Sequence, residues 1–298
     1  MADERKSISN PTADEIREAA KELNFNMDKN ELDTYEGFMG GLTDNVRFVD
    51  ELDEQIVTAD FPRTNVHRPN DDDNPYNAWF YKCNIKGAER GKLAGKTLAI
   101  KDNISVADVP MMNGSDVYEG FVPNEDASVV KRVLEAGGEI LGKAVCENFC
   151  FSGGSHTSAT GPVRNPHNED FMAGGSSSGC AALIVGGHCD MGIGSDQGGS
   201  VRMPASFSGC YGIKPTYGLV PYTGAGGIEY SVDHLGPMAR NVSDLALLLE
   251  VISGYDNGCD PRQKSELVVK SYSEEILKGI EGLKIGIVAE GFDTPGSE

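Results

Sequence analysis

The spacing of apolar residues predicts helices in the first part of the chain. Apolar positions recur at helical spacing between residues 16 and 23, directly after Thr12 and Glu15, which have the form of a capping box. A second helical pattern covers residues 30–50, and a polar, proline-containing connector follows at residues 62–75. We therefore expect a helical N-terminal region over residues 1–80 and a main domain over residues 81–298.

From about residue 92 the pattern changes, and short apolar runs alternate with helical stretches. The predicted strands cover residues 97–100 (TLAI), 139–144 and 284–289 (KIGIVA). The predicted helices cover residues 128–136 and 243–253, the second with Ser243 as its N-cap. This alternation is typical of an α/β domain whose central sheet is covered by helices on both faces.

Residues 152–227 are crowded with glycine and serine, yet they contain too many apolar residues for a flexible linker. Glycines in such a setting indicate tight turns and close approach to a ligand. Ser200 follows two of them, so backbone N–H groups there can turn toward a bound oxygen, as an oxyanion hole requires. Ser200 is therefore a candidate nucleophile, which needs a base to remove its proton.

None of the five histidines is well placed to be that base. His156 and His167 flank the glycine-rich region, His188 ends an apolar helical stretch, and His67 and His234 are isolated. Lys101 is the better candidate. It follows the predicted strand at 97–100, where partial burial favours the neutral amine.

Four segments together resemble the amidase signature family: residues 99–103 (AIKDN), 174–179 (GGSSSG), 196–204 (DQGGSVRMP) and 214–218 (KPTYG). The resemblance covers the chain from about residue 75 to its end. It implies a triad in which Lys101 is the base, Ser176 is a bridging serine and Ser200 is the nucleophile.

The resemblance also assigns roles around the triad. It implies an oxyanion hole of backbone N–H groups at residues Gln197, Gly198, Gly199 and Ser200. It implies a cis peptide bond at Gly175–Ser176. Asp196 and Arg202 are expected to form an ion pair that shapes the loop, with Ser177 as a further structural support.

At the level of the whole chain, the resemblance implies a mixed central sheet with helices on both faces and an N-terminal helical appendage. Several stretches, among them residues 142–153, look closer still to bacterial amidases that accompany nitrile hydratases. In that group the N-terminal helices contribute to dimerisation, so a homodimer is expected. Family members are usually longer by half or more, which predicts that the C-terminal part of the fold is missing. The expected substrates are small aliphatic or aryl amides, hydrolysed without metal or organic cofactor.

Three other interpretations remain open. Residues 175–179 also match the G-x-S-x-G nucleophile elbow, which would make Ser177 the nucleophile and would require an acid and a histidine downstream. The chain could be an amidotransferase subunit that releases ammonia from glutamine for charging tRNA. It could also be a non-enzymatic or inactive protein that kept the fold.

Charge and cysteine content narrow the expected partners. The net charge of -20 argues against nucleic acid and against anionic membrane surfaces. Residues 1–10 lack the apolar region of a signal peptide, and no apolar stretch is long enough to span a membrane. Seven cysteines at irregular spacings indicate reduced thiols in a cytoplasmic protein. Cys146 and Cys150 share a helical spacing, but without a second pair they are interpreted as structural thiols rather than zinc ligands.

Overall fold

The computed structural model describes residues 9–50 and 59–292 and divides the chain into two compact units, Met1–Val57 and Thr58–Glu298. The start of the chain at residues 1–8, where no signal peptide is expected, lies outside the described residues. The division falls earlier than residue 80, because β1 (Thr64–His67) already pairs with β2 (Trp79–Lys86). Part of the predicted connector is therefore the first strand of the main unit.

The N-terminal unit contains two helices, α1 (Ala13–Glu22) and α2 (Lys29–Asp50). The predicted capping box is present: the Glu15 N–H donates to Thr12 Oγ1 at 3.3 Å, and the Thr12 N–H donates to Glu15 Oε2 at 2.7 Å. Several large apolar side chains of this unit are exposed, including Leu23, Phe25, Phe38, Leu42 and Phe48. The two helices therefore leave much apolar surface uncovered.

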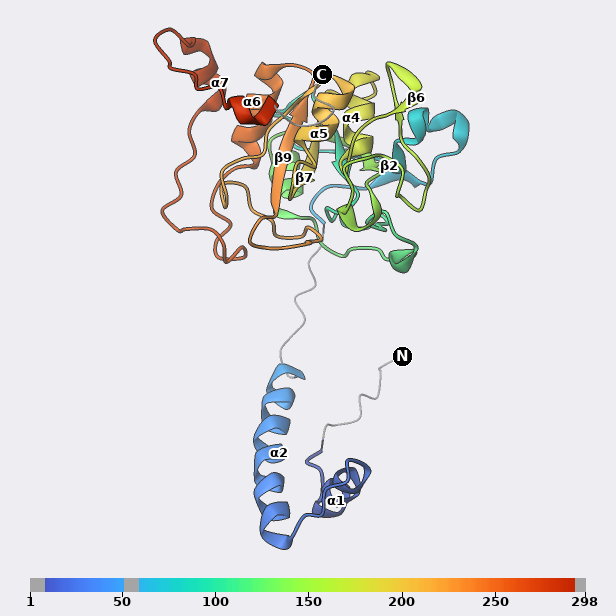
Figure 1. The fold of residues 1–298 in the computed structure, drawn as a ribbon, viewed down its shortest axis with the longest axis vertical. Helices are drawn as coiled ribbons and strands as arrows, with labels where there is room; N and C mark the ends of the chain where they lie inside the picture. The colour runs from blue at the N-terminus through green and yellow to red at the C-terminus, as the bar shows by residue number, and fades with distance from the viewer. Residues whose placement is uncertain (1–8, 51–58, 293–298) are drawn as a thin grey trace. The chain divides into compact units, whose positions relative to one another are not determined.

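The main unit is built on a mixed central sheet, to which the strands labelled β2, β7 and β9 in Figure 1 belong. The strand order is β1-β2-β4-β3-β7-β9-β8. The remaining strands of this sheet are β3 (Thr97–Lys101), β4 (Glu139–Ala144), β7 (Met191–Asp196), β8 (Tyr211–Gly212) and β9 (His234–Ala239). β3 runs parallel to both β4 and β7, and the other pairs are antiparallel. A separate hairpin joins β5 (Arg164–Asn165) and β6 (Asn168–Met172).

Helices cover both faces of this sheet, as the sequence predicts. Successive side chains of a strand point to opposite faces. Leu98 and Ile100 of β3 join the core that contains α3 (Ser128–Glu135) and α6 (Val242–Ile252). Ala99 between them joins the core that contains α4 (Ser178–Val185) and α5 (Arg202–Ser208). α4 is buried along almost its whole length, which its uniformly small and apolar residues allow.

Short helical turns complete the described fold: η1 (Asp71–Asp73), η2 (Pro75–Asn77), η3 (Asp116–Tyr118), η4 (Asn148–Cys150), α7 (Tyr272–Glu275), η5 (Ile276–Lys278) and η6 (Ala289–Phe292).

Two sequence predictions are wrong in detail. The N-cap of α6 is Asn241 and not Ser243, because the Asn241 side chain accepts a hydrogen bond from the Asp244 N–H at 2.8 Å. Residues 284–289 do not form a strand, and Ile285 and Ile287 are 80% and 79% exposed. Alternating apolar residues make a strand only where another strand satisfies their backbone groups. Among the described residues, this segment has no strand partner.

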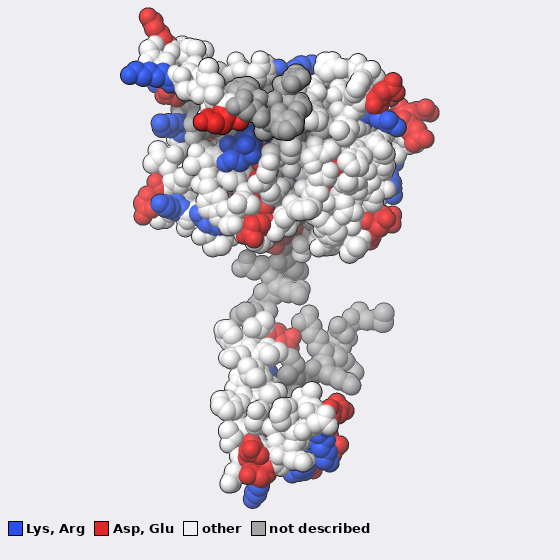
Figure 2. All heavy atoms as spheres, viewed as in Figure 1, with Lys and Arg blue, Asp and Glu red and all other residues white. Residues whose placement is uncertain are grey.

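Acidic and basic side chains are interspersed with uncharged surface on the face of the main unit drawn in Figure 2. Within residues 9–50 and 59–292, no helix is long and apolar enough to cross a membrane. The same part of the chain contains no group of three or more His, Cys, Asp or Glu side chains arranged to hold a metal ion.

Candidate active site

Lys101 lies at the end of β3, between its two parallel neighbours, and its side chain is fully buried. The Nζ atom is 2.7 Å from Ser176 Oγ, 2.8 Å from Ser195 Oγ and 3.3 Å from the Ser195 carbonyl oxygen. Among the described residues, no carboxylate forms an ion pair with this amine. The hydrogen-bond partners of the Lys101 amine are therefore two hydroxyl groups and one carbonyl group.

Ser176 is held in the glycine-rich segment that enters α4. The Gly175–Ser176 peptide bond is cis, and the Ser176 carbonyl accepts a hydrogen bond from the Glu147 N–H at 3.2 Å. A side chain at Gly175 would place its Cβ 2.1 Å from the Gly154 carbonyl oxygen, so only glycine fits there. This close backbone approach fixes the position from which Ser176 reaches Lys101.

Ser200 lies in the loop between β7 and α5 and is 6% exposed. Its carbonyl accepts a hydrogen bond from the Ser177 N–H at 3.1 Å, which brings the two glycine-rich segments side by side. Among the described residues, the Ser200 hydroxyl has no hydrogen-bond partner. The link from Lys101 to Ser176 is thus formed in this structure, whereas the link from Ser176 to Ser200 is not.

Asp196 organises the loop that carries Ser200. The Arg202 guanidinium donates two hydrogen bonds to its carboxylate, at 2.9 and 2.8 Å, and the backbone N–H groups of Gly199 and Val201 donate at 2.8 and 3.1 Å. Burial opposes the charged form, but the Arg202 and backbone hydrogen bonds hold the pKa of Asp196 below its usual range. A buried carboxylate with several hydrogen bonds thereby fixes the loop, beside the packing of Val201 in the core.

The same contacts reduce the number of backbone N–H groups that are available for the expected oxyanion hole. The Gly199 N–H is already donated to Asp196, which leaves the N–H groups of Gln197, Gly198 and Ser200 as the candidates of the predicted set. The Gln197 side chain donates to the Tyr222 hydroxyl at 3.2 Å, and that hydroxyl donates to the Gly226 carbonyl at 3.0 Å. Gln197 is therefore anchored through its side chain as well as through the loop.

Sequence reasoning missed a second buried lysine beside the site. Lys143 of β4 forms an ion pair with Asp102 at 3.1 Å, and both side chains are buried. Burial raises the pKa of Asp102, although Lys143 and the N–H groups of Met112 and Asn113 oppose this shift. One signal in the sequence could have predicted the pair. Lys143 is a charged residue within the apolar strand at 139–144, and Asp102 is a carboxylate that directly follows Lys101.

Sequence reasoning also missed Ser195 and Cys150. Ser195 is the penultimate residue of β7, and in the sequence it is only one serine among several in a glycine-rich setting. Cys150, which is expected to be a structural thiol, is buried, and its sulfur accepts a hydrogen bond from Ser195 Oγ at 3.9 Å. Their position next to Lys101 follows from the pairing of β3 with β7, which local sequence does not reveal.

The nucleophile elbow at Ser177 lacks the partners that it requires. The Ser177 hydroxyl is buried and donates to the Ser195 carbonyl at 3.3 Å. Among the described residues, no hydrogen bond joins a histidine to Ser177 or to the predicted triad; His167, for example, lies 2.9 Å from the Ser208 carbonyl. The arrangement favours Lys101 over any histidine as the base.

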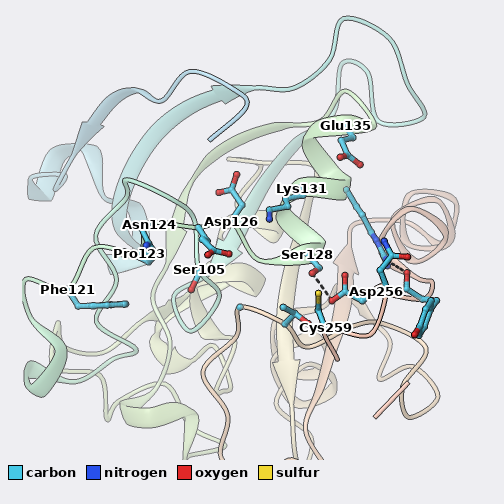
Figure 3. A pocket seen from close by; sticks show the side chains of 16 residues that line it. Ser105, Phe121, Pro123, Asn124, Asp126, Ser128, Lys131, Glu135, Asp256 and Cys259 are labelled. Carbon is cyan, nitrogen blue, oxygen red and sulfur yellow. Dashed lines mark hydrogen bonds between the residues drawn. The ribbon is translucent and has the colours of Figure 1, made fainter. Parts of the chain in front are cut away.

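A cavity of about 430 Å³ lies elsewhere on the main unit (Figure 3). Residues of α3 and of the segments around Thr223 and Asp256 line it, and Ser128 donates a hydrogen bond to Asp256 at 2.8 Å. None of its lining residues belongs to the predicted triad or oxyanion hole. We therefore do not assign this cavity to the substrate of the Lys101 site.

Comparison with known proteins agrees with this geometry. The family model described as Amidase matches residues 69–298. An enantioselective amidase of Rhodococcus rhodochrous is 51% identical over 225 residues, which are 75% of this chain and 43% of that protein. A glutamyl-tRNA(Gln) amidotransferase subunit of Methanosarcina acetivorans is 42% identical over 212 residues, which are 71% of this chain and 44% of that protein.

Solved structures give the same result. The peptide amidase of Stenotrophomonas maltophilia matches with a TM-score of 0.58 and 34% identity, over 63% of this chain and 39% of that one. A glutamyl-tRNA(Gln) amidotransferase subunit of Thermotoga maritima matches with a TM-score of 0.58 and 39% identity, over 60% of this chain and 39% of that one. The chain spans less than half the length of these relatives. With the family model matched over most of its length, the chain belongs to the amidase signature family.

Proposed function

We propose that the protein hydrolyses carboxylic acid amides to the acid and ammonia through a serine acyl-enzyme, with Lys101, Ser176 and Ser200 as its triad. The observation that carries the proposal is the 2.7 Å contact between Lys101 Nζ and Ser176 Oγ in a buried site where no carboxylate of the described chain pairs with the amine. An amine without a counter-charge is more stable in its neutral form when it is buried, so it can accept a proton.

In the proposed reaction, Ser176 gives its proton to Lys101 and takes the proton of Ser200. Ser200 Oγ then attacks the amide carbonyl carbon, and backbone N–H groups at residues 197–200 stabilise the negative charge on the oxygen. The proton returns through Ser176 to the leaving nitrogen, so the carbon–nitrogen bond breaks and ammonia departs. Water then attacks the acyl-enzyme along the same route and releases the acid. The proposal requires no metal or organic cofactor.

The missing contact between Ser176 and Ser200 is compatible with this mechanism. Catalytic hydrogen bonds are often long or poorly aligned without substrate and tighten when it binds. The Ser177 N–H to Ser200 carbonyl bond already holds the two segments together, so a rotation about the Ser200 Cα–Cβ bond is the movement we expect.

The proposed substrates are small aliphatic or aryl carboxamides. The names of two relatives support amide cleavage, one an enantioselective amidase and the other a peptide amidase. A glutamine-dependent amidotransferase subunit is the second candidate, and the 42% identity to the Methanosarcina acetivorans protein favours it. Ammonia release from benzamide and from glutamine, measured without partner subunits, separates the two activities.

We also propose a cytoplasmic homodimer that associates through its N-terminal helices and binds neither nucleic acid nor membranes. Seven free thiols support a reducing compartment, and the net charge of -20 supports the absence of anionic partners. The exposed apolar side chains of α1 and α2 support a dimer contact. Sedimentation of the protein with Phe38→Glu and Leu42→Glu should then report a monomer.

The nucleophile is tested by covalent labelling and turnover together. A fluorophosphonate should add to Ser200, as located by peptide mass spectrometry, and Ser200→Ala should lose both the label and ammonia release. Labelling at Ser177, or full activity of Ser200→Ala, would overturn the triad. A wild-type protein that neither reacts with the probe nor hydrolyses any amide would identify an inactive homologue.

A further inference from the structure

The hydrogen bonds around Lys101 extend beyond the proposed triad to a buried thiol. Ser195 Oγ, which lies 2.8 Å from Lys101 Nζ, donates to Cys150 Sγ at 3.9 Å. The Cys150 thiol donates to Asn113 Oδ1 at 3.4 Å, and its sulfur also accepts a hydrogen bond from Cys146. Cys150 is 3% exposed, so these contacts form away from solvent.

The backbone holds Cys150 in this place at the expense of local strain. Phe149 and Cys150 both have left-handed conformations, with φ of 48° and 60°, which side-chain-bearing residues rarely adopt in succession. The Phe149 N–H donates to the Asn113 carbonyl at 3.0 Å, and the Cys150 N–H donates to the Glu147 carbonyl at 2.8 Å. Such strain persists where the surrounding structure enforces it, and it clusters at functional sites.

The direction of each hydrogen bond follows from the donors and acceptors present. A neutral lysine amine has two N–H donors and one lone pair. The Ser195 carbonyl accepts only, so it takes one N–H. If the Ser195 hydroxyl gives its own proton to Cys150, its oxygen must accept the second N–H. The lone pair then faces Ser176, as proton abstraction requires.

We infer that Cys150 is a positioning residue, whose sulfur takes the Ser195 proton and thereby keeps the lone pair of Lys101 directed at Ser176. The inference rests on the proposed function, because it assigns a role within that triad. It holds for the thiol and for the thiolate, since both have lone pairs that accept from Ser195. Without the sulfur, the Ser195 hydroxyl is free to donate to Lys101 and occupy the lone pair.

The charges around Cys150 strengthen this arrangement. Burial alone would raise the pKa of Cys150, but the hydrogen bond from Cys146 and the nearby Lys101 lower it to about 6. The other titratable groups that interact with this thiol are Cys180 of α4 and Tyr222; burial raises the pKa of each, and Cys150 adds to the rise. Asp102 acts on the neighbouring Cys146.

The first test compares Cys150→Ala, Cys150→Ser and the control Cys83→Ala, whose thiol is equally buried in the core and donates to the Ile140 carbonyl at 3.9 Å. Ammonia release from benzamide is measured across pH. Cys150→Ala should lower kcat about tenfold with little change in KM. Cys150→Ser, which keeps a hydrogen-bond acceptor at this position, should recover part of kcat. Wild-type kcat in Cys150→Ala, or an equal loss in Cys83→Ala, would overturn the inference.

The second test needs no turnover, so it stays decisive if the proposed function fails. Thiolate absorbance in the ultraviolet is titrated for the wild type, Cys150→Ala and Lys101→Met. The wild type minus Cys150→Ala difference should show a thiolate that forms below the range of ordinary cysteines, and Lys101→Met should move that titration to higher pH. A wild-type protein that hydrolyses no amide but shows this coupling would refute the proposed function and keep the network. Identical titration of the Cys150 thiol in the wild type and in Lys101→Met would refute the network.

Discussion

Two fully buried lysines lie on neighbouring parallel strands, and their surroundings differ. Lys143 of β4 has a carboxylate partner, Asp102, at 3.1 Å. Lys101 of β3 has two hydroxyl groups and a carbonyl instead. The register pairs Lys101 with Ala144 and Lys143 with Ile100, so the two lysines point to opposite faces of the sheet. Burial alone does not distinguish a structural lysine from a proposed base; the charge of its partners does.

The largest effects are expected from replacing each lysine by methionine. Lys143→Met leaves the Asp102 carboxylate buried without its counter-charge and should lower the free energy of unfolding by about 3–5 kcal/mol. Lys101→Met strands no carboxylate, so its stability should change by about 1 kcal/mol, whereas amide hydrolysis should fall about a thousandfold. Thermal unfolding and ammonia release measure the two losses separately.

The matched control for Lys143→Met is the double variant that carries both Lys143→Met and Asp102→Asn. The asparagine can still accept from the N–H groups of Met112 and Asn113, which lie 3.0 and 2.8 Å from Asp102 Oδ2. Removing both charges should restore a large part of the lost stability. A double variant as unstable as Lys143→Met alone would show that volume, rather than charge, sets the difference between the two lysines.

The next effect concerns the hydroxyl that faces Lys101. Gly175→Ala would put a Cβ 2.1 Å from the Gly154 carbonyl oxygen, so Ser176 must move away from the amine. We expect a loss of about 1–3 kcal/mol in stability and of most activity. In Gly198→Ala, the new Cβ meets no atom within 4 Å, and stability should stay within about 0.5 kcal/mol. Equal unfolding temperatures for the two variants would contradict this account.

A smaller effect is expected from the carboxylate of Asp196, which holds the loop that carries Ser200. Hydrogen bonds from Arg202 and from backbone N–H groups hold the pKa of Asp196 below its usual range, against the effect of burial. The stability from this group is therefore present above the pKa of an unfolded aspartate, about 3.9, and is lost as pH falls through the lower folded value. Arg202→Gln should cost about 1 kcal/mol at neutral pH and shift acid unfolding to higher pH. Acid unfolding of both proteins can be followed by circular dichroism. If Arg202→Gln unfolded at the same pH as the wild type, this would contradict the pairing of Asp196 with Arg202.

How far the sequence predicts this molecule depends on the range of the interaction concerned. The strand at 139–144 and the helix at 128–136 follow from local periodicity, and both are present as β4 and α3. The family motifs placed Lys101 and Ser176 together, although they lie 75 residues apart. Lys143 with Asp102, and Cys150 with Ser195, depend on strand register and on two left-handed residues, which no local pattern encodes. Residues 284–289 have the periodicity of a strand but no strand partner within the described chain.

The smallest effect should come from Ser177→Ala. The Ser177 hydroxyl and Lys101 share one acceptor, the Ser195 carbonyl, at 3.3 Å each. Without Ser177, that carbonyl keeps its bond to Lys101, so the amine stays oriented and kcat should fall by less than about tenfold. A nucleophile elbow predicts the opposite, complete loss of turnover and of fluorophosphonate labelling. Measuring both quantities in Ser177→Ala and in Ser200→Ala therefore decides which hydroxyl attacks.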